Sequence, residues 1–217
     1  MANNFQPIPQ DTIAENFKWR DWFRSVSSWI RSTGSMALQE SNAVNITGGS
    51  IKDTSINLPF GSFSSTATQS VSVINTPTRV AFNTTDFANY TNFVSGDGIH
   101  VSKSGLYNVQ FSIQVTNADN TSHDMAIWLR HGVYGGSIVD IPWSNSVTSV
   151  VGTHGGQPGY GVMAANFFVR LQATDYIEFW WSTNSLQVQL QALPAITTPF
   201  VSPGAPSIVT TLTYISS

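Results

Sequence analysis

The chain has 217 residues, which is enough for one substantial domain and an extension. Charged residues make up only 10%, against roughly 25% in an average soluble domain. The formal net charge is -3 and no stretch is strongly basic, which argues against nucleic-acid binding. The chain has no cysteine, which excludes disulfides and thiolate metal sites.

The N-terminus shows no charged-then-apolar signal segment, and no apolar run reaches about 18 residues. We therefore expect no membrane insertion, and a protein that stays in the cytoplasm or leaves the cell only as part of a particle. Ser, Thr, Asn, Gln and Gly take the place of charged residues. Such a neutral polar surface suits an assembled particle or an extracellular adhesin.

Residues 1–35 form a first region in which apolar residues have helical spacing. Between Ile13 and Arg31 many of them follow one another at steps of three or four, which predicts an amphipathic helix that Gly34 ends. Three tryptophans in one terminal helix are typical of anchors, so we predict that the stripe docks on a partner or self-associates. The alternative is that it packs on the protein's own core. The aromatic members of the stripe are Phe17, Trp19, Trp22, Phe23 and Trp29.

Residues 36–65 form a second region, in which single aliphatic residues alternate with small and polar ones. Val44, Ile46 and Ile51 supply too little apolar surface for a core within one chain. Wound with two partner chains, these side chains could line a narrow shared axis, so we predict a thin stalk element. A flexible linker is the alternative.

Residues 66–217 form the third region, and their pattern predicts an antiparallel β-sandwich. Apolar and polar side chains alternate from Tyr107 to Val115 and again from Gln187 to Ala192, as in strands with one buried face. Many short strands with Gly, Pro and Asn between them favour this fold class. The expected strands are Val71–Ile74, Thr78–Asn83, Ile99–Val101, Gly105–Thr116, Met125–His131, Val162–Gln172, Tyr176–Ser182, Leu186–Ala192 and Ser207–Ser216.

One expected strand is apolar on both faces. From Tyr176 to Trp181 the only charge is Glu178, and both alternating sets of side chains contain aromatic residues. A strand of this kind needs cover on both faces, whereas the outer face of a single sandwich is wet. We therefore predict that a second copy of the chain covers the outer face.

The third region resembles a known family in three stretches. "GIHVSKSGLYNVQFSIQV" resembles the signature stretch of the complement-type globular head, "VRLQATDYIEFWW" is similar to that family's strand, acidic turn and strand, and "IVTTLTYIS" is similar to its closing strand. The resemblance implies a ten-stranded jelly roll of the tumour necrosis factor superfamily, which is normally a homotrimer. With that symmetry, Tyr176 or Trp180 is expected near the threefold axis. The stretch from Ser137 to Gly161 is longer and richer in Gly than this pattern.

Two shorter stretches resemble parts of tailed-bacteriophage fibres. "NAVNITGGSI" resembles the short element near the stalks of such fibre proteins, and the preceding "FKWRDWF" is similar to the N-terminal virion-attachment segments of podovirus-type fibres. The order of an attachment helix followed by a stalk element agrees with both resemblances. They imply a fibre attached to the virion through its N-terminus.

The third region contains no catalytic or metal-binding motif. None of His100, His123, His131 and His154 stands at metal-ligand spacing with another histidine. The carboxylates fall mostly in turns, where Asp caps backbone amides, so we expect no enzyme activity, no cofactor and no metal. The Gly-rich run "GTHGGQPGYG" lacks the Lys and Ser/Thr of a phosphate loop and is interpreted as a surface loop, with a binding loop as the alternative.

Loop aromatics are the candidates for recognition. Tyr90, Tyr134, Trp143 and Tyr160 are expected in or beside loops, and aromatic rings stack well on sugars and on protein surfaces. The segments 87–93, 131–143 and 154–160 are expected to include loops distal to the stalk. The alternative is that these rings plug the ends of the sandwich or the trimer seam.

The sequence thus predicts a structural protein of a tailed-phage virion. It would be a homotrimeric short fibre or spike that binds other virion proteins through its N-terminus and a host-surface polysaccharide or protein through its head. A capsid decoration protein, cement protein or head fibre is the structural alternative. A stand-alone sugar-binding lectin is the alternative from a different class.

Overall fold

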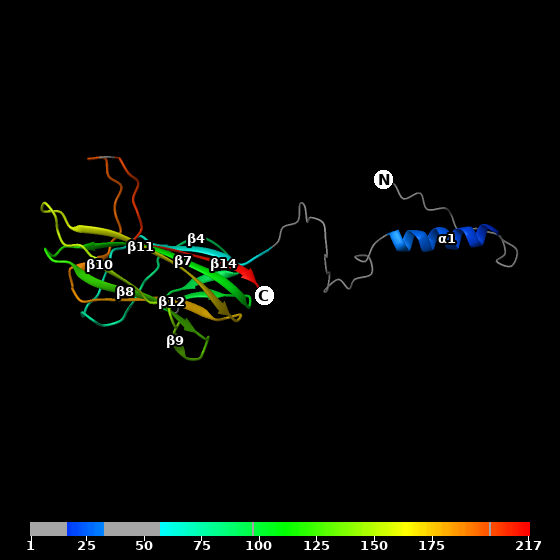
Figure 1. Ribbon diagram of the computed structural model, residues 1–217, viewed down its shortest axis with the longest axis horizontal. Helices are drawn as coiled ribbons and strands as arrows, with labels where there is room; N and C mark the ends of the chain where they lie inside the picture. Colours follow the sequence, from blue (N-terminus) through cyan, green and yellow to red (C-terminus); the bar gives the residue numbers. More distant parts are fainter. Residues whose placement is uncertain (1–16, 33–56, 97, 200) are drawn as a thin grey trace. The chain divides into compact units, whose positions relative to one another are not determined.

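The computed structural model of the protein describes residues 17–32, 57–96, 98–199 and 201–217. The chain divides into two compact units, residues 1–55 and 56–217 (Figure 1). The described part of the first unit is one helix, and the second unit is built from two antiparallel sheets. The expectation of a mainly β protein with a helix near its N-terminus is confirmed.

Helix α1 spans Phe17–Ser32, close to the range predicted from its apolar spacing. The rings of Trp19, Trp22 and Phe23 pack on one another with centroids between 5.2 and 5.9 Å apart, because positions three and four apart share a helix face. Phe23 and Trp29 nevertheless stay 53% and 40% exposed. The aromatic stripe is therefore partly exposed along this helix.

The first sheet, sheet A, has the strand order β11-β7-β14-β1-β4, and β13 and β2 continue it where β14 leaves β7. The second sheet, sheet B, has the order β10-β8-β12-β6-β5, with β3 paired to β12 and β9 paired to β8. The strands of sheet A are β1 (Phe60–Ser65), β2 (Gln69–Ser70), β4 (Thr84–Asn89), β7 (Gly105–Asn117), β11 (Gly159–Leu171), β13 (Val188–Leu190) and β14 (Ile208–Ser216). Those of sheet B are β3 (Thr78–Arg79), β5 (Thr91–Val94), β6 (Gly98–Val101), β8 (His123–Gly132), β9 (Ile138–Asp140), β10 (Ser146–Val150) and β12 (Tyr176–Thr183).

The core lies between the two sheets and is filled by every second residue of the long strands. In β7 the side chains from Tyr107 to Val115 alternate as predicted, with the apolar set buried. Phe63 from β1 and Trp181 and Phe179 from β12 are among the largest fully buried side chains. Each such side chain contributes roughly 1.5–3 kcal/mol by burial, so this layer supplies most of the stability of the sandwich.

The sandwich begins earlier in the chain than residue 66, where its start was predicted. Strand β1 runs between β14 and β4, and its Phe63 is fully buried. The pattern "FGSFSS" was missed because Gly and Ser accompany its two aromatic residues. The predicted strand at 71–74 is wrong, because the strand there is β2, which ends at Ser70, and the predicted strand at 78–83 shrinks to the two residues of β3. Strands β4 and β5 form where only loops were expected.

The two ends of the sandwich differ in their relation to the incoming chain. The Lys103 ammonium donates to the carbonyl of Asn57 (3.1 Å), so the β6–β7 turn lies at the near end, where the chain enters. At the far end the side chain of Asn117 donates to the carbonyls of Thr121 and Val150 (2.8 and 3.1 Å). It thereby joins the β7–β8 and β10–β11 connections, which lie opposite the C-terminus in Figure 1.

A hairpin-like arm connects β13 to β14. Leu193 pairs with Ala205, and Ile196 pairs with Ser202, in isolated antiparallel bridges. The arm projects from the sandwich as the orange segment of Figure 1. No Asp, Glu, Lys, Arg or His follows Glu178 in the sequence, so the arm and the strands around it are uncharged.

Candidate functional site

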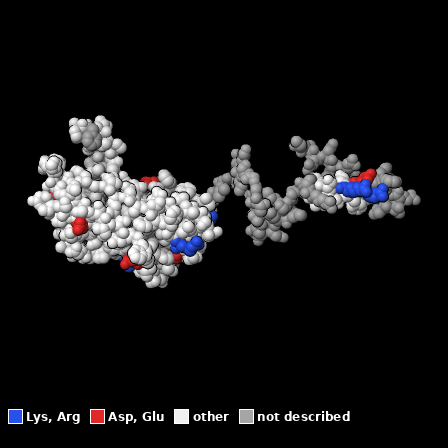
Figure 2. Space-filling model, in the orientation of Figure 1, with Lys and Arg blue, Asp and Glu red and all other residues white. Residues whose placement is uncertain are grey.

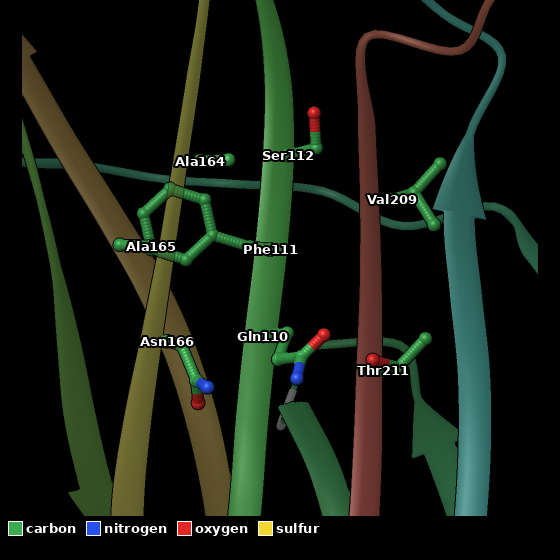
Figure 3. A pocket seen from close by; sticks show the side chains of 8 residues that line it. All are labelled: Gln110, Phe111, Ser112, Ala164, Ala165, Asn166, Val209 and Thr211. Carbon is green, nitrogen blue, oxygen red and sulfur yellow. The ribbon is translucent and has the colours of Figure 1, made fainter.

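The outer face of sheet A carries few charges, and we call its outward side chains on β7, on β14 and on β11 from Tyr160 to Phe168 the neutral face. Strand register aligns two rows of side chains across it: Asn166, Gln110 and Thr211 form one row, and Ala164, Ser112 and Val209 form the next. Figure 3 shows these six side chains along the three strands. They line a shallow groove of about 540 Å³.

Larger apolar side chains stand at both ends of this groove on β11. Val162 is 65% exposed and Phe168 is 63% exposed, each one step beyond a row of the groove floor. Tyr160, 54% exposed, follows in the direction of the far end. Exposed apolar side chains grouped around a neutral floor mark a surface suited to contact with another macromolecule.

Charge is almost absent from this sheet. Its strands contain two charged residues, Asp86 and Arg170. Asp86 accepts hydrogen bonds from Ser62 (3.0 Å) and Ser64 (3.3 Å) of β1, so its carboxylate is committed within the sheet. Figure 2 shows a mostly uncharged surface on which Lys, Arg, Asp and Glu occur in isolated spots. Arg170 is exposed on β11, two residues beyond Phe168 and outside the groove, so a partner of the groove needs no compensating charge.

The outer face of sheet B, in contrast, is covered by a polar network. Glu178, 6% exposed, forms an ion pair with Arg79 (3.0 Å) and accepts a hydrogen bond from the Trp180 indole (2.6 Å). The Arg130 guanidinium lies 4.9 Å from the centre of the Trp180 ring. Arg130 of β8 also forms an ion pair with Asp140 of β9 (3.1 Å), so charges of opposite sign are paired across the strands of this face.

Tyr176, at the near end of β12, is covered in a similar way. His100 stacks on its ring with centroids 4.9 Å apart, and Tyr134 packs edge-on against His100. Gly132 passes directly under the ring, because a Cβ there would come within 2.1 Å of Tyr176. The outward residues of this strand thus find their cover within the chain. Their apolar pattern no longer requires a second chain, although a subunit contact at Tyr176 or Trp180 stays a prediction.

The four aromatic residues predicted for recognition do not come together in one site. Tyr90 lies at the near end, where the Lys103 ammonium is 4.2 Å from its ring centre. Tyr134, 71% exposed, belongs to the β8–β9 turn beside Tyr176. Tyr160 lies on the neutral face, and Trp143 stands alone after β9 at 98% exposure. Each of these residues therefore marks a different surface.

Two of the four histidines pair with carboxylates. His123 lies 2.7 Å from Asp119, and His131 lies 2.7 Å from the buried carboxylate of Asp175. The hydrogen bond from His123, followed by that from the Asn120 amide, lowers the pKa of Asp119 below its usual value. Within the described residues, no group of three or more His, Cys, Asp or Glu side chains gathers at one point.

The structure describes the predicted anchor residues but not the predicted stalk residues. Phe17 begins α1, Trp19, Trp22 and Phe23 form the ring cluster described above, and Trp29 lies further along the helix. Val44, Ile46 and Ile51 lie outside the described residues, so their stalk role stays a prediction. Across the described residues, no helix has both the length and the apolar character that crossing a membrane requires.

Sequence reasoning missed the groove of the neutral face and the surroundings of Trp143. The outward residues Gln110 and Ser112 were recognised as a polar face, but their alignment with β11 and β14 depends on pairing between strands distant in sequence. Trp128 and Asp140, which adjoin Trp143, also come from other strands.

In comparisons with known proteins, no family model matches the chain, and no curated protein matches it.

Proposed function

We propose that this protein is a structural protein of a tailed-phage virion, a homotrimeric short fibre that attaches through its N-terminal segment and presents its sandwich to the host surface. The observation that carries the proposal is the contrast between a neutral, open sheet A and a self-covered sheet B. Such a chain is suited to assembly, because a monomer gains nothing from an uncharged groove on an outer sheet face that is rimmed with exposed apolar residues.

The strand order supports a jelly roll for the head. Ten strands make the two main layers, β4-β1-β14-β7-β11 and β5-β6-β12-β8-β10. The four longest strands of this span alternate between the sheets in chain order, with β7 and β11 in sheet A and β8 and β12 in sheet B, while β10 pairs with β8. The first and closing strands lie side by side. This interleaving is what a double-sheet roll of Greek keys requires. The remaining strands are only two or three residues long.

The neutral face is the proposed contact between subunits. A ring of three copies needs a heterologous contact, in which this face meets a different surface of the next copy. The groove floor of small and amide side chains would receive that surface without burying an unpaired charge. Val162 and Phe168 would lose their exposure to water at the same time.

Helix α1 supports attachment to the particle. A helix of 16 residues is marginal in water by itself, and its stability in proteins comes mainly from packing of its apolar face. Trp19, Trp22 and Phe23 form a ready cluster for such packing. In the proposed fibre this face docks on another virion protein.

Two measurements test the proposal. Native mass spectrometry of the full chain should give a trimer, and a monomer would contradict it. Incubation with fibre-less particles should incorporate the full chain but not a chain that lacks residues 1–35, while the truncated chain keeps the circular dichroism of a β protein. Incorporation of the truncated chain would place the anchor elsewhere.

A capsid decoration protein, which shares the anchor and the trimer, is the second candidate. Decoration predicts particles that burst more easily when the gene is absent, together with unchanged adsorption to cells. A fibre for host recognition predicts the opposite, because purified heads would then block adsorption.

A further inference from the structure

Trp143 has a geometry that folding alone does not explain. It lies between β9 and β10, is 98% exposed, and has a φ of 65°, in the left-handed region that bulky residues rarely adopt. Such strain amounts to about 1–3 kcal/mol and persists only where the surrounding structure enforces it. A large apolar ring held in water by a strained backbone contributes nothing to the core. We therefore look for its role in binding.

The backbone on both sides of Trp143 is fixed to the sheet. The amide of Ile141 donates to the carbonyl of Leu129 (2.9 Å). The hydroxyl of Ser144, 1% exposed, accepts from the amide of Leu129 (3.0 Å) and donates to the carbonyl of Ile141 (2.8 Å). Pro142 and Trp143 therefore project between two points that are tied to β8, so the backbone that carries the indole is fixed.

A pocket of about 320 Å³ lies beside the ring, with Trp128 and Asp140 among its walls. The Trp128 indole donates to Oδ1 of Asp140 (3.0 Å), and Arg130 lies 3.1 Å from the same oxygen. The carboxylate is thus held in place although it is 69% exposed, and Oδ2 has no hydrogen-bond partner among the described residues. The other lining residues are Ala126, Ile141, Trp143 and Asn145.

We propose that this pocket binds one pyranose ring of a surface polysaccharide, with the sugar stacked on the Trp143 indole. A pyranose presents an apolar face of C–H groups and an equatorial rim of hydroxyls. The indole suits that face, while Oδ2 of Asp140 accepts hydroxyl hydrogen bonds and the Asn145 amide both donates and accepts. The volume lies at the small end of ligand pockets, which fits a single ring. The inference deepens the proposed function and relies on it for the host setting alone.

A protein partner is the competing occupant, and the walls of the pocket argue against it. Specific protein interfaces bury roughly 800 Å² on each side and exclude charge from their centre. Beside Trp143, however, stand an exposed carboxylate and an amide at the edge of the sheet. Three such pockets on one fibre would add avidity to weak single sites.

The test is saturation-transfer NMR on the full chain with four oligosaccharides: maltohexaose, cellohexaose, chitohexaose and a galactohexaose. Transfer to the ring C–H protons of at least one of them is expected. The Trp143→Ala variant should lose at least tenfold in affinity, and Trp143→Tyr should restore part of it. Trp143→Asn, which accepts a left-handed φ, should behave like Trp143→Ala, because the ring and not the backbone strain is what binds.

Asp140→Asn should weaken binding severalfold, while Tyr134→Ala, which removes an exposed ring elsewhere, should leave binding unchanged. The inference is overturned if none of the four sugars binds, if Trp143→Ala binds as well as the unmodified chain, or if Trp143 is needed only to capture a purified host protein. Native mass and particle incorporation of the same samples separate the two proposals. Trimers that incorporate but bind no sugar refute this inference alone, and monomers that bind sugar through Trp143 refute the fibre alone.

Discussion

The two outer faces of the sandwich differ in whether contacts within the chain cover their outward side chains. Sheet B carries aromatic residues outward and covers them with its own ion pairs, as Glu178, Arg79 and Trp180 show. The neutral face of sheet A carries small, polar and uncharged side chains outward, with Val162 and Phe168 exposed beside a shallow groove. An apolar outer strand is therefore no guide to where a partner binds. The better guide is a face on which nothing within the chain completes the contacts.

The largest effect should follow from a charge on the neutral face. Ser112→Glu would place a carboxylate in the middle of the groove, where burial of an unpaired charge is unfavourable by several kcal/mol. We expect at least a hundredfold weaker trimer and an unchanged unfolding midpoint of the separated head, measured by native mass spectrometry and urea unfolding.

The matched control for this change is Asn92→Glu, an exposed site on sheet B that should keep the trimer. Trp180→Glu tests the opposite possibility, a subunit contact on sheet B. If Trp180→Glu gives stable, folded monomers while Ser112→Glu stays trimeric, the subunit contact lies on sheet B, as the sequence pattern predicts.

The second effect tests whether sheet B completes itself. Glu178→Ala would leave Arg79 and the Trp180 indole without their carboxylate, and Glu178 is nearly buried. We expect a loss of about 2–3 kcal/mol in the free energy of unfolding of the head, less than for a fully buried pair because Arg79 is 36% exposed. Urea unfolding of Glu178→Ala, Arg79→Ala and the double variant gives the coupling energy, expected at about 1 kcal/mol. If the effects of the two single variants on the free energy of unfolding simply add in the double variant, the ion pair does not stabilise the outer face of sheet B.

The same two faces show which features of the fold the sequence predicts. The alternation from Tyr107 to Val115 predicts β7 correctly, because a strand with one buried face records its geometry locally. The cover over Trp180 comes from Arg79 and Arg130, which approach it only through the pairing of β3 and β8 with β12. Nothing in the local pattern of residues 176–181 reveals these partners.

The same limit applies to the candidate sites. Trp143 was singled out as an aromatic residue in a loop, and Asp140 stands only three residues before it, but Trp128 meets it only in the folded sheet. Strand β1 escaped prediction because its Ser62 and Ser64 look like loop residues, whereas in the fold they bind Asp86. Contacts between distant strands, which decide register and cover, are the part that a single sequence does not carry.

The third prediction probes the core that both faces share. Tyr107 is buried and donates to the carbonyl of Lys103 (2.6 Å), and its burial, followed by the nearby Tyr214, raises the pKa of Tyr107 to about 12. Since an unfolded tyrosine ionises near pH 10, the unfolded chain loses this proton first. Stability from this group is full below about pH 10 and falls between about pH 10 and 12, by roughly 2 kcal/mol. Thermal unfolding of Tyr107→Phe should show a shallower alkaline decline, while an equal decline in both proteins would contradict the assignment.

The smallest effect lies at the far end of the sandwich and should touch neither face. The lowered pKa of Asp119 means that the folded state favours the ionised carboxylate, which accepts from His123 and from the Asn120 amide. The stability it contributes is present above the ordinary aspartate pKa of about 4 and is lost as the pH falls through the lower folded value. Asp119→Asn should therefore lower the melting temperature slightly at pH 7 and leave it unchanged near pH 2. Because the β7–β8 loop belongs to the far end, this variant should keep both the trimer and the response of the head to Glu178→Ala. A change in native mass on Asp119→Asn would mean that the far end, and not the neutral face alone, takes part in assembly.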